Sequence, residues 1–377
     1  MYAGELKSEM ACVTGATGFV GGHVARLLAA RGDAVRVTYR DSARLARLRG
    51  IDVEPVKADV LDRAAMRRAV RGTQVIFHTA GYVNSRPAER VWRINAMSPR
   101  VVVEAAAAEG VGRVVLTSTV AAIGTAAGDE VADETHVYRP GGAGMDYADS
   151  KHEGEQEAMA AGARLGVDVV VVNPSYVLGV PVDRSEPGET STRTVANYML
   201  GRLPAVVDGA TNIVDVEDVA AGHLLAAARG RPGQRYVLGG YNLAWTELID
   251  RLAAQSGVRH PLLVLPRDVA ALARVQSELG LPGPVAPEAL ILMAQNWRYS
   301  SRKAKKELGY KTRPLEKTLA ATIDWSRELI DAGAYRGRGA SAMSLGSAWL
   351  RGAERLGLGA GLRTAERYLG RRLVAGQ

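Results

Sequence analysis

The sequence predicts an α/β fold: a Rossmann-type doubly wound parallel sheet with a smaller, interrupted C-terminal substrate lobe. An apolar run at 10–13 is followed at once by a glycine cluster and then by an apolar helical repeat that reaches residue 31. Strand-like and helix-like patterns then alternate with short links, which implies parallel pairing. Small or polar residues follow the expected strand ends, and doubly wound sheets bind their ligands at that edge.

The first strand, glycine turn and helix form a pattern that suits a dinucleotide. Gly15 can take a tight turn, Gly18 lets a pyrophosphate approach the backbone, and Gly21 lets the helix pack against the strand. The helix N-terminus then offers N–H groups and a partial positive charge to the phosphates. A turn in an α/β domain without a cofactor is the alternative. The expected cofactor contacts in this stretch are Gly15, Thr17, Gly18, Phe19, Val20 and Gly21.

The second strand, 34–39, ends where such folds choose between NAD and NADP. An acidic side chain at this point binds the ribose hydroxyls of NAD. Here the strand ends in Tyr39-Arg40-Asp41. A guanidinium can hold a 2′-phosphate with two hydrogen bonds, so Arg40 favours NADP, while Asp41 keeps NAD possible. The alternative for Arg40 is a solvated loop charge.

Three later strand ends complete the expected ligand-binding edge of the sheet, which is called the rim below. The carboxylate of Asp59, after the strand at 52–56, could reach an adenine amino group. The fourth strand ends in small residues that let backbone touch a cofactor, and its His78 is expected to be a packed structural histidine rather than a catalyst. The fifth strand, 113–116, runs into three hydroxyl residues. Cofactor contacts are expected from Asp59, Val60, Thr79, Ala80, Gly81, Asn95 and Thr117.

A possible acid–base pair begins the next polar helix. Tyr147 and Lys151 are four residues apart, so they share a helix face. A nearby ammonium favours the phenolate and lowers the pKa of a tyrosine from about 10 towards the working range. Tyr147 could then protonate a ketone or deprotonate an alcohol, with a nicotinamide exchanging the hydride. Thr119 would hold the same oxygen, and Ser118 is its substitute. Such pairs also occur on exposed helices without function.

These motifs resemble the extended short-chain dehydrogenase/reductase superfamily over roughly 10–330. The segments TGATGFVG, TST at 117–119 and YADSK carry the resemblance. VVNPSYVLG, NIVDVEDVAAGHLLA and GRPGQRYVLGG are similar to its dihydroflavonol-reductase-like and hopanoid-associated sugar-epimerase branch. The resemblance implies that Tyr147 is the acid/base, that Lys151 also binds the nicotinamide ribose, and that Thr119 is the hydroxyl partner. It also implies cofactor contacts from Asn173, Pro174 and Ser175, and a homodimer through 95–110 and 147–162.

Two departures from nucleotide-sugar members bear on the substrate. Those members usually place an arginine for the diphosphate where Asn212 stands, and their marker after the sixth strand differs from Asn173-Pro174-Ser175. A sugar diphosphate would then depend on other residues, such as Arg193 or Arg202. We therefore expect a substrate with a less charged body.

The expected dinucleotide-binding domain covers 1–175 and 212–245, and the expected substrate lobe covers 176–211 and 246–335. Residues 212–240 are expected to return to the main sheet, with Asp218 capping their helix. A Gly/Pro-rich loop at 181–193 is expected to cover the pocket. The expected substrate-side residues are Val83, Ser118, Tyr176, Asn197 and Tyr198.

The basic character of the chain belongs to its last segment, 336–377. This segment holds eight arginines and two glutamates, a net +6 of the total +8, which leaves +2 for 1–335 and no indication of nucleic-acid binding. Its arginines interleave with leucines and aromatics in a loosely helical pattern, which suggests a basic amphipathic tail. Peripheral membrane contact is one hypothesis; packing on a partner or a disordered tail are the alternatives.

Other bulk features exclude several classes of site. The single cysteine, Cys12, lies in the first strand and allows no disulfide framework, and six scattered histidines suggest no metal. The sequence shows no leader and no run of about 18 apolar residues, so we expect a cytoplasmic protein, with peripheral contact with a membrane as one hypothesis.

Three functions remain open at this point. The first is an NADP(H)-dependent oxidoreductase that interconverts a ketone and a secondary alcohol. The second is a nucleotide-sugar epimerase or dehydratase with tightly bound NAD. The third is a non-catalytic dinucleotide sensor, which would have no need for Thr119, Tyr147 and Lys151 together.

Overall fold

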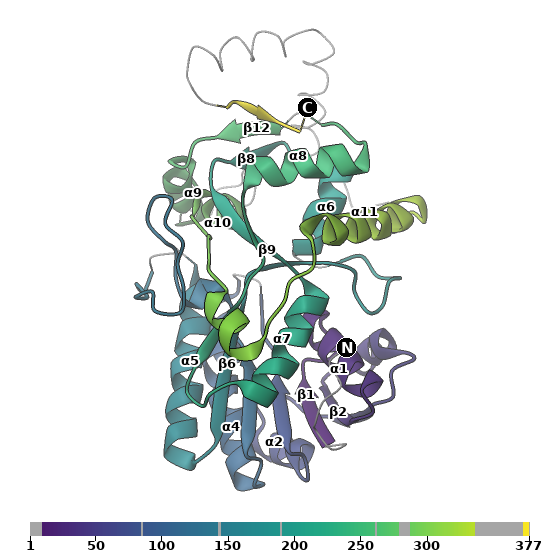
Figure 1. Cartoon of the computed structure of the whole chain (residues 1–377), viewed down its shortest axis with the longest axis vertical. Coiled ribbons are helices and arrows are strands. Elements are labelled where there is room, and N and C mark those ends of the chain that lie inside the picture. The colour runs from purple at the N-terminus through teal and green to yellow at the C-terminus, as the bar shows by residue number, and fades with distance from the viewer. Residues whose placement is uncertain are drawn as a thin grey trace.

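A seven-stranded parallel sheet with helices on both faces forms one end of the molecule, and a smaller lobe forms the other (Figure 1). The computed structural model describes residues 10–83, 86–141, 145–188, 191–260, 262–278, 287–335 and 372–376. The strand order is β10-β6-β5-β4-β1-β2-β3, which reverses direction at β1 and is the doubly wound arrangement expected from the sequence. The strands are β1 (Met10–Thr14), β2 (Ala34–Tyr39), β3 (Glu54–Lys57), β4 (Val75–His78), β5 (Arg113–Thr117), β6 (Asp168–Pro174) and β10 (Arg235–Leu238).

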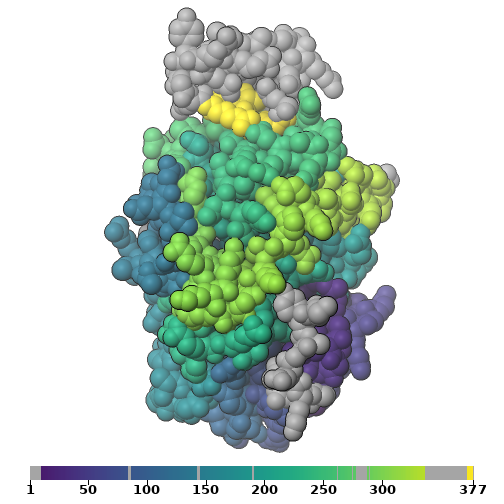
Figure 2. Space-filling model, viewed as in Figure 1, coloured from purple at the N-terminus to yellow at the C-terminus, as the bar shows by residue number. Residues whose placement is uncertain are grey.

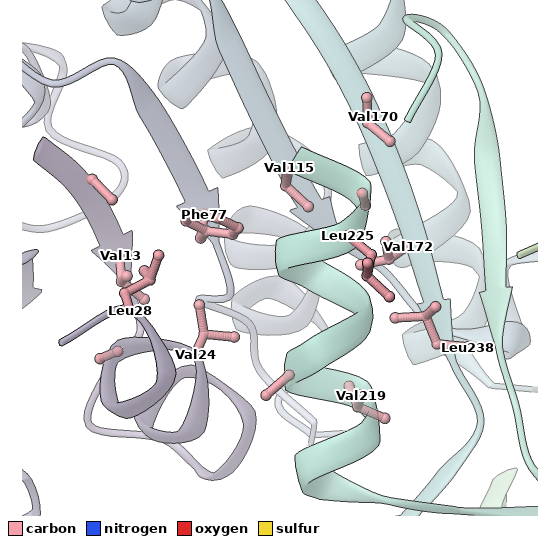
Figure 3. Close-up of a cluster of buried hydrophobic side chains, with 14 of the residues drawn as sticks. Val13, Val24, Leu28, Phe77, Val115, Val170, Val172, Val219, Leu225 and Leu238 are labelled. Atoms are coloured by element: carbon pink, nitrogen blue, oxygen red, sulfur yellow. The ribbon is translucent and has the colours of Figure 1, made fainter. Parts of the chain in front are cut away.

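Two apolar layers cover the sheet. On one face α1 (Phe19–Ala30) packs against α7 (Val216–Arg229). Val24 of α1, Val219 of α7 and Phe77 of the sheet belong to one buried apolar cluster, which Figure 3 shows. The other face carries α2 (Arg63–Val70), α4 (Ser98–Ala108) and α5 (Asp146–Leu165). The strands are apolar on both faces because both are buried.

Shorter helices complete this end of the molecule. They connect the strands or follow their ends, and the most important for the site is the turn of π-helix η2, which leads from α3 into α4. Their bounds are η1 (Ser42–Leu48), α3 (Ala88–Trp92), η2 (Arg93–Met97), η3 (Val120–Ala122) and η4 (Ala304–Leu308).

Among the described residues, the smaller lobe contains two three-stranded sheets and five helices. The first sheet has the order β11-β9-β7 and the second β13-β12-β8. Its strands are β7 (Tyr176–Leu178), β8 (Ala205–Val207), β9 (Ala210–Asp215), β11 (Tyr241–Ala244), β12 (Leu262–Leu265) and β13 (Val374–Ala375). Its helices are α6 (Ser191–Met199), α8 (Trp245–Ser256), α9 (Val269–Glu278), α10 (Pro287–Ala294) and α11 (Leu315–Asp331).

The stretch 212–240 differs in part from the expectation. Helix α7 and strand β10 join the main sheet as expected, but β9 pairs with β7 and β11 in the smaller lobe. The expected cap is also wrong. Asp215, not Asp218, is the N-cap of α7 and accepts a hydrogen bond from the Glu217 N–H. Asp218 lies inside the helix, and its carboxylate accepts two hydrogen bonds from Arg313. Because Arg313 occupies both oxygens, this carboxylate does not cap the helix.

The last described residues, 372–376, return to the smaller lobe (Figure 2). Strand β13 pairs antiparallel with β12, and Arg372 forms a two-pronged salt bridge with Asp250 of α8. The rest of the basic segment, 336–371, lies outside the described residues. In the part of the chain that the structure describes, no helix is both long and apolar enough to cross a bilayer.

Candidate functional site

The glycine turn between β1 and α1 leaves no room for larger side chains. Gly15 has a φ of +73°, and a Cβ there would lie 2.6 Å from the Ala80 nitrogen of the loop after β4. A Cβ on Gly21 would overlap the Thr79 hydroxyl and the Gly15 carbonyl oxygen. A Cβ on Gly18, the N-cap of α1, would lie 3.1 Å from the same carbonyl oxygen. Thr17 belongs to the same turn, and Phe19 and Val20 begin α1.

Hydrogen bonds join the loop after β4 to the glycine turn and to helix α5. The Thr79 hydroxyl donates to the Thr14 carbonyl at 2.6 Å. The Asn95 amide holds both backbone groups of Tyr82, at 2.8 and 2.9 Å, and donates to Ser150 of α5 at 3.2 Å. Asn95 therefore joins the loop that includes Ala80 and Gly81 to α5. Its place is structural as well as adjacent to the rim.

His78 lies inside the sheet rather than at the rim. It is fully buried and bridges the hydroxyls of Thr14 and Ser98 at 2.7 and 3.1 Å. Ser98 donates its proton to the Ile94 carbonyl, so the His78 Nε2 donates to Ser98 and Nδ1 accepts from Thr14. Burial lowers the pKa of His78 to about 3, which keeps the ring neutral.

The end of β2 carries exposed charges beside the glycine turn. Arg40 is exposed and its guanidinium lies 3.9 Å from the Asp59 carboxylate, which follows β3. Asp59 also accepts from the Leu61 N–H, and its neighbour Val60 is buried. Asp41 caps η1 by accepting from the Ala43 N–H. These groups are near the place where the 2′ position of a bound dinucleotide is expected.

Sequence reasoning missed a second arginine at this end. Arg47 of η1 donates to the Thr17 carbonyl at 3.3 Å and forms an ion pair with Glu186 of the loop at 181–188. Arg47, Glu186 and neighbouring residues of that loop line a narrow cleft with Gly18 and Phe19. The loop therefore covers the glycine turn. The sequence shows that Arg47 lies seven residues after Arg40. It does not show that the Arg47 side chain points towards the glycine turn.

Tyr147, Lys151 and Thr119 meet at the carboxyl end of β5. The Thr119 side chain lies close enough to the Tyr147 hydroxyl to lower its pKa. Lys151 is 7% exposed and its ammonium donates to the Thr117 carbonyl at 2.8 Å. A Cβ placed on Gly81 would lie 3.7 Å from the Lys151 Nζ, so the loop after β4 and the amine are neighbours. The ends of β4 and β5 and the first turns of α5 thus converge around the expected nicotinamide position.

The pKa of Tyr147 corrects one expectation. Burial raises it to about 12, and the Thr119 side chain offsets only part of that rise. Burial lowers the pKa of Lys151 to about 8. The expected lowering of the Tyr147 pKa by Lys151 is absent because the ammonium is bound to the Thr117 carbonyl and the phenol is desolvated. In this state Tyr147 is a proton donor at neutral pH.

Five other residues of the rim have distinct positions. The Thr117 hydroxyl donates to the buried His223 of α7 at 2.7 Å. The Thr117 group that contacts the rim is therefore its carbonyl, which accepts from Lys151. Ser118, Asn173 and Ser175 are buried, and the Ser118 hydroxyl, the Asn173 carbonyl oxygen and the Ser175 hydroxyl have no partner among the described residues. Pro174, between two of them, is the last residue of β6. Buried polar atoms without a partner are expected to be satisfied by a ligand or water.

The expected substrate-side residues divide into two groups. Val83 is exposed, and Tyr176 is partly buried with its hydroxyl 2.7 Å from Thr194. Asn197 is partly exposed on α6. Tyr198 is a correction: it is fully buried and its hydroxyl donates to the Val258 carbonyl. It lies in the apolar core of the smaller lobe, because the helical repeat of α6 turns it inward, away from the rim.

The arrangement fits a nicotinamide dinucleotide. The glycine turn is a cradle that a Cβ would fill, and buried hydroxyls without partners lie beside Lys151 and Tyr147. Among the described residues no group of three or more histidine, cysteine or acidic side chains could hold a metal ion.

Comparisons with known proteins agree with this geometry. The model of the NAD dependent epimerase/dehydratase family matches residues 11–239. A Synechocystis protein named as a candidate dihydroflavonol 4-reductase is 34% identical over 327 residues, which cover 83% of this chain and 93% of that protein. Cinnamoyl-CoA reductase 1 of Oryza sativa is 32% identical over 84% of this chain and 90% of its own length. The solved structure of PA4631, a nucleoside-diphosphate-sugar epimerase from Pseudomonas aeruginosa, has a TM-score of 0.70 and 28% identity, covering 87% of this chain and 99% of that one.

Proposed function

Because the chain belongs to the NAD dependent epimerase/dehydratase family of extended short-chain dehydrogenases/reductases, we propose that it interconverts a ketone and a secondary alcohol with NADP(H). The family consists of NAD(P)-dependent enzymes, and this chain is one of them. The observation that carries the proposal is the convergence of Tyr147 and Thr119 with Lys151 at the carboxyl end of β5.

The residues act as follows in the reductive direction. When bound, the reduced nicotinamide supplies a hydride to the carbonyl carbon. Tyr147 donates its phenolic proton to the carbonyl oxygen, and the Thr119 hydroxyl holds that oxygen in line. The Thr119 side chain favours the phenolate that remains. Lys151 donates to the Thr117 carbonyl at the end of the same strand. A Tyr147 pKa of about 12 keeps the proton on the phenol until a carbonyl oxygen is in place to receive it.

Asn212 supports a ketone or alcohol over a nucleotide sugar. It is buried, donates to Asn242 at 2.5 Å, and accepts from the Gly240 N–H at 2.7 Å. Arg202 donates to the Tyr335 carbonyl. The Asn212 amide is therefore occupied by contacts with Asn242 and the Gly240 backbone. It is uncharged, so it offers no positive charge to a diphosphate.

A nucleotide-sugar epimerase or dehydratase with tightly held NAD is the second candidate, favoured by the similarity to the PA4631 epimerase. The two differ in cofactor turnover. The reductase should bind and release NADPH freely and consume it only with a carbonyl substrate. The epimerase should purify with NAD and show no net consumption. A non-catalytic dinucleotide sensor would have no need for Tyr147, Lys151 and Thr119 together.

The experiment is a carbonyl-substrate panel with NADPH absorbance as readout. We expect NADPH loss with at least one ketone, and Tyr147→Phe should reduce kcat by at least about a hundredfold because it removes one proton-transfer group. NADPH affinity should remain within about twofold. Full turnover by Tyr147→Phe would remove Tyr147 from its role, and co-purified NAD without NADPH oxidation would favour the epimerase.

The preference for NADP over NAD rests on Arg40 at the end of β2, supported by Arg47 at the glycine turn. Arg40→Asp should lower NADP affinity at least about tenfold while NAD affinity stays within about threefold, because a guanidinium–phosphate pair is lost. Fluorescence titration with both cofactors measures the ratio. An unchanged ratio would contradict the assignment.

We propose two associations for the chain. The family resemblance supports a homodimer through 95–110 and 147–162, and light scattering should then give twice the 40.0 kDa of one chain. The arginine-rich sequence at 336–371 supports a cytoplasmic protein in peripheral contact with an anionic membrane. Liposome sedimentation of the full chain and of a variant ending at Ala334 tests this; equal partitioning would contradict it.

A further inference from the structure

A buried ion pair lies next to Tyr147 and Lys151, here called the catalytic pair, and the mechanism proposed above does not use it. Glu155 is on α5, one turn beyond Lys151, and its side chain is 0% exposed. Its partner is Arg235 on the edge strand β10, with 3.2 Å between Nη2 and Oε2. Burying a charged pair in a sheet core is costly unless geometry and hydrogen bonds compensate. The position beside the reacting groups suggests a role beyond stability.

The other carboxylate oxygen connects to the catalytic hydroxyl. Glu155 Oε1 accepts from the Asn173 Nδ2 at 2.6 Å. The same amide donates to the Thr119 carbonyl at 2.9 Å. Thr119 is the N-cap of η3 and has an extended backbone, so this contact holds the residue whose side chain lies close to the Tyr147 phenol. The chain Arg235–Glu155–Asn173–Thr119 therefore runs from the sheet edge to the acid.

We propose, on the basis of the function proposed above, that Glu155 is a positioning residue for the catalytic pair. Its carboxylate fixes the Thr119 backbone through Asn173 and keeps Lys151 in the ammonium form. Arg235 is the counter-charge of this carboxylate inside the protein.

Electrostatics beside Lys151 support this role. Burial lowers the pKa of Lys151 to about 8, and Glu155 is the charge that acts in the opposite direction. The other titratable groups facing this region are Tyr147 on the same helix, His78 from β4, Arg235 from β10, and Tyr138 of the loop before α5, whose pKa the Glu155 charge helps to raise. His78 and Tyr147 are neutral at pH 7, so the Glu155 carboxylate is the negative charge that sustains the ammonium.

The test separates charge from hydrogen bonding. Glu155→Gln keeps an acceptor for Asn173 but removes the charge, whereas Glu155→Asp keeps the charge but shortens the reach to Asn173. The Lys151 titration is followed by competitive acetylation with acetic anhydride across pH, read by mass spectrometry. This readout needs no substrate, so it remains informative if the proposed reaction is wrong.

We expect Glu155→Gln to lower the titration midpoint of Lys151 by about one pH unit, because it removes a neighbouring opposite charge. Glu155→Asp should leave the midpoint near wild type while lowering kcat, with the KM for NADPH unchanged. Arg235→Gln should raise the midpoint or leave it unchanged. Glu157→Gln on the surface of the same helix, which loses only an ion pair with Arg100, should match wild type.

A Lys151 midpoint in Glu155→Gln that stays within about half a unit of wild type overturns the proposal. Equal shifts in the Gln and Asp variants do so as well, because they would indicate a merely structural role. If Glu155→Gln does not fold, the double variant with Arg235→Gln replaces it, since no single charge is then left buried. Its midpoint should still fall below that of Arg235→Gln alone, and equality of the two would contradict the proposal.

Discussion

At the scale of single residues, small changes decide whether the cofactor turn can form. The backbone of the β1–α1 turn touches the loop after β4, so the positions of Gly15 and Gly21 are limited by atoms rather than by flexibility alone. Tyr147 is a second example, because burial raises its pKa above the ordinary value, whereas the sequence predicts a lowered one. Local environment determines the chemistry that residue types alone only permit.

Gly21→Ala should weaken NADPH binding at least about tenfold and lower the free energy of unfolding by about 1–3 kcal/mol, because its Cβ overlaps two backbone-anchored oxygens. Cofactor fluorescence and urea unfolding measure the two effects. Gly112→Ala is the control, since no atom lies within 4 Å of its Cβ; it should change the free energy by less than about 0.5 kcal/mol. Equal effects of both substitutions would contradict the steric argument.

At the scale of elements, the loop at 181–188 is tied down on both sides of the glycine turn. The Glu186–Arg47 ion pair fastens it to η1, and Arg184 forms a salt bridge with Glu328 of α11 at 2.7 Å. The Trp325 indole donates to the Arg184 carbonyl at 2.9 Å. His23 of α1 donates to the Val180 carbonyl just before the loop, at 2.9 Å. The loop thus joins the two ends of the molecule over the cofactor cleft.

Glu186→Gln should raise NADP affinity by about two- to fivefold, because Arg47 no longer shares its charge with a carboxylate. NAD affinity should change less, since it lacks the 2′-phosphate. Titration of both cofactors checks this. Glu328→Gln breaks the outer salt bridge of the same loop and should leave both affinities unchanged; a parallel rise in that variant would point to loop mobility instead of charge.

At the scale of the whole molecule, three buried histidines tie the packing to pH. His23, His78 and His223 come from α1, β4 and α7, and burial lowers their pKa values to about 4, 3 and 4. In the unfolded chain they titrate near 6.5, so the unfolded state takes up protons first as the pH falls. Their contribution to stability is therefore complete above pH 6.5 and is lost progressively below it.

Urea unfolding between pH 7.5 and 4.5 should show a free energy that falls below pH 6.5, by about 1.4 kcal/mol per pH unit for each histidine. His223→Gln should reduce this slope by about one such increment, because Gln can still accept from Thr117 but does not titrate. His136→Gln, in a partly exposed loop position, should keep the wild-type slope. Identical slopes in both variants would contradict the assignment.

The sequence by itself determined the doubly wound sheet, the glycine turn and the convergence of strand ends at one rim. These features follow from periodicity, from glycine spacing and from the rule that parallel strands end on the same edge. The resemblance on YADSK and TST pointed to Tyr147, Lys151 and Thr119 as one group. The sequence also indicated that His78 is a packed structural histidine, and it is buried inside the sheet.

Only the tertiary structure decided what surrounds these groups. The inward turn of Tyr198, the choice of Asp215 over Asp218 as cap, and the pairing of β9 in the smaller lobe depend on contacts between distant segments. So do the Glu155–Arg235 pair, 80 residues apart in the chain, and the desolvation that raises the pKa of Tyr147. Burial and charge pairing are sums over neighbours in space, and a local pattern of residues holds no record of them.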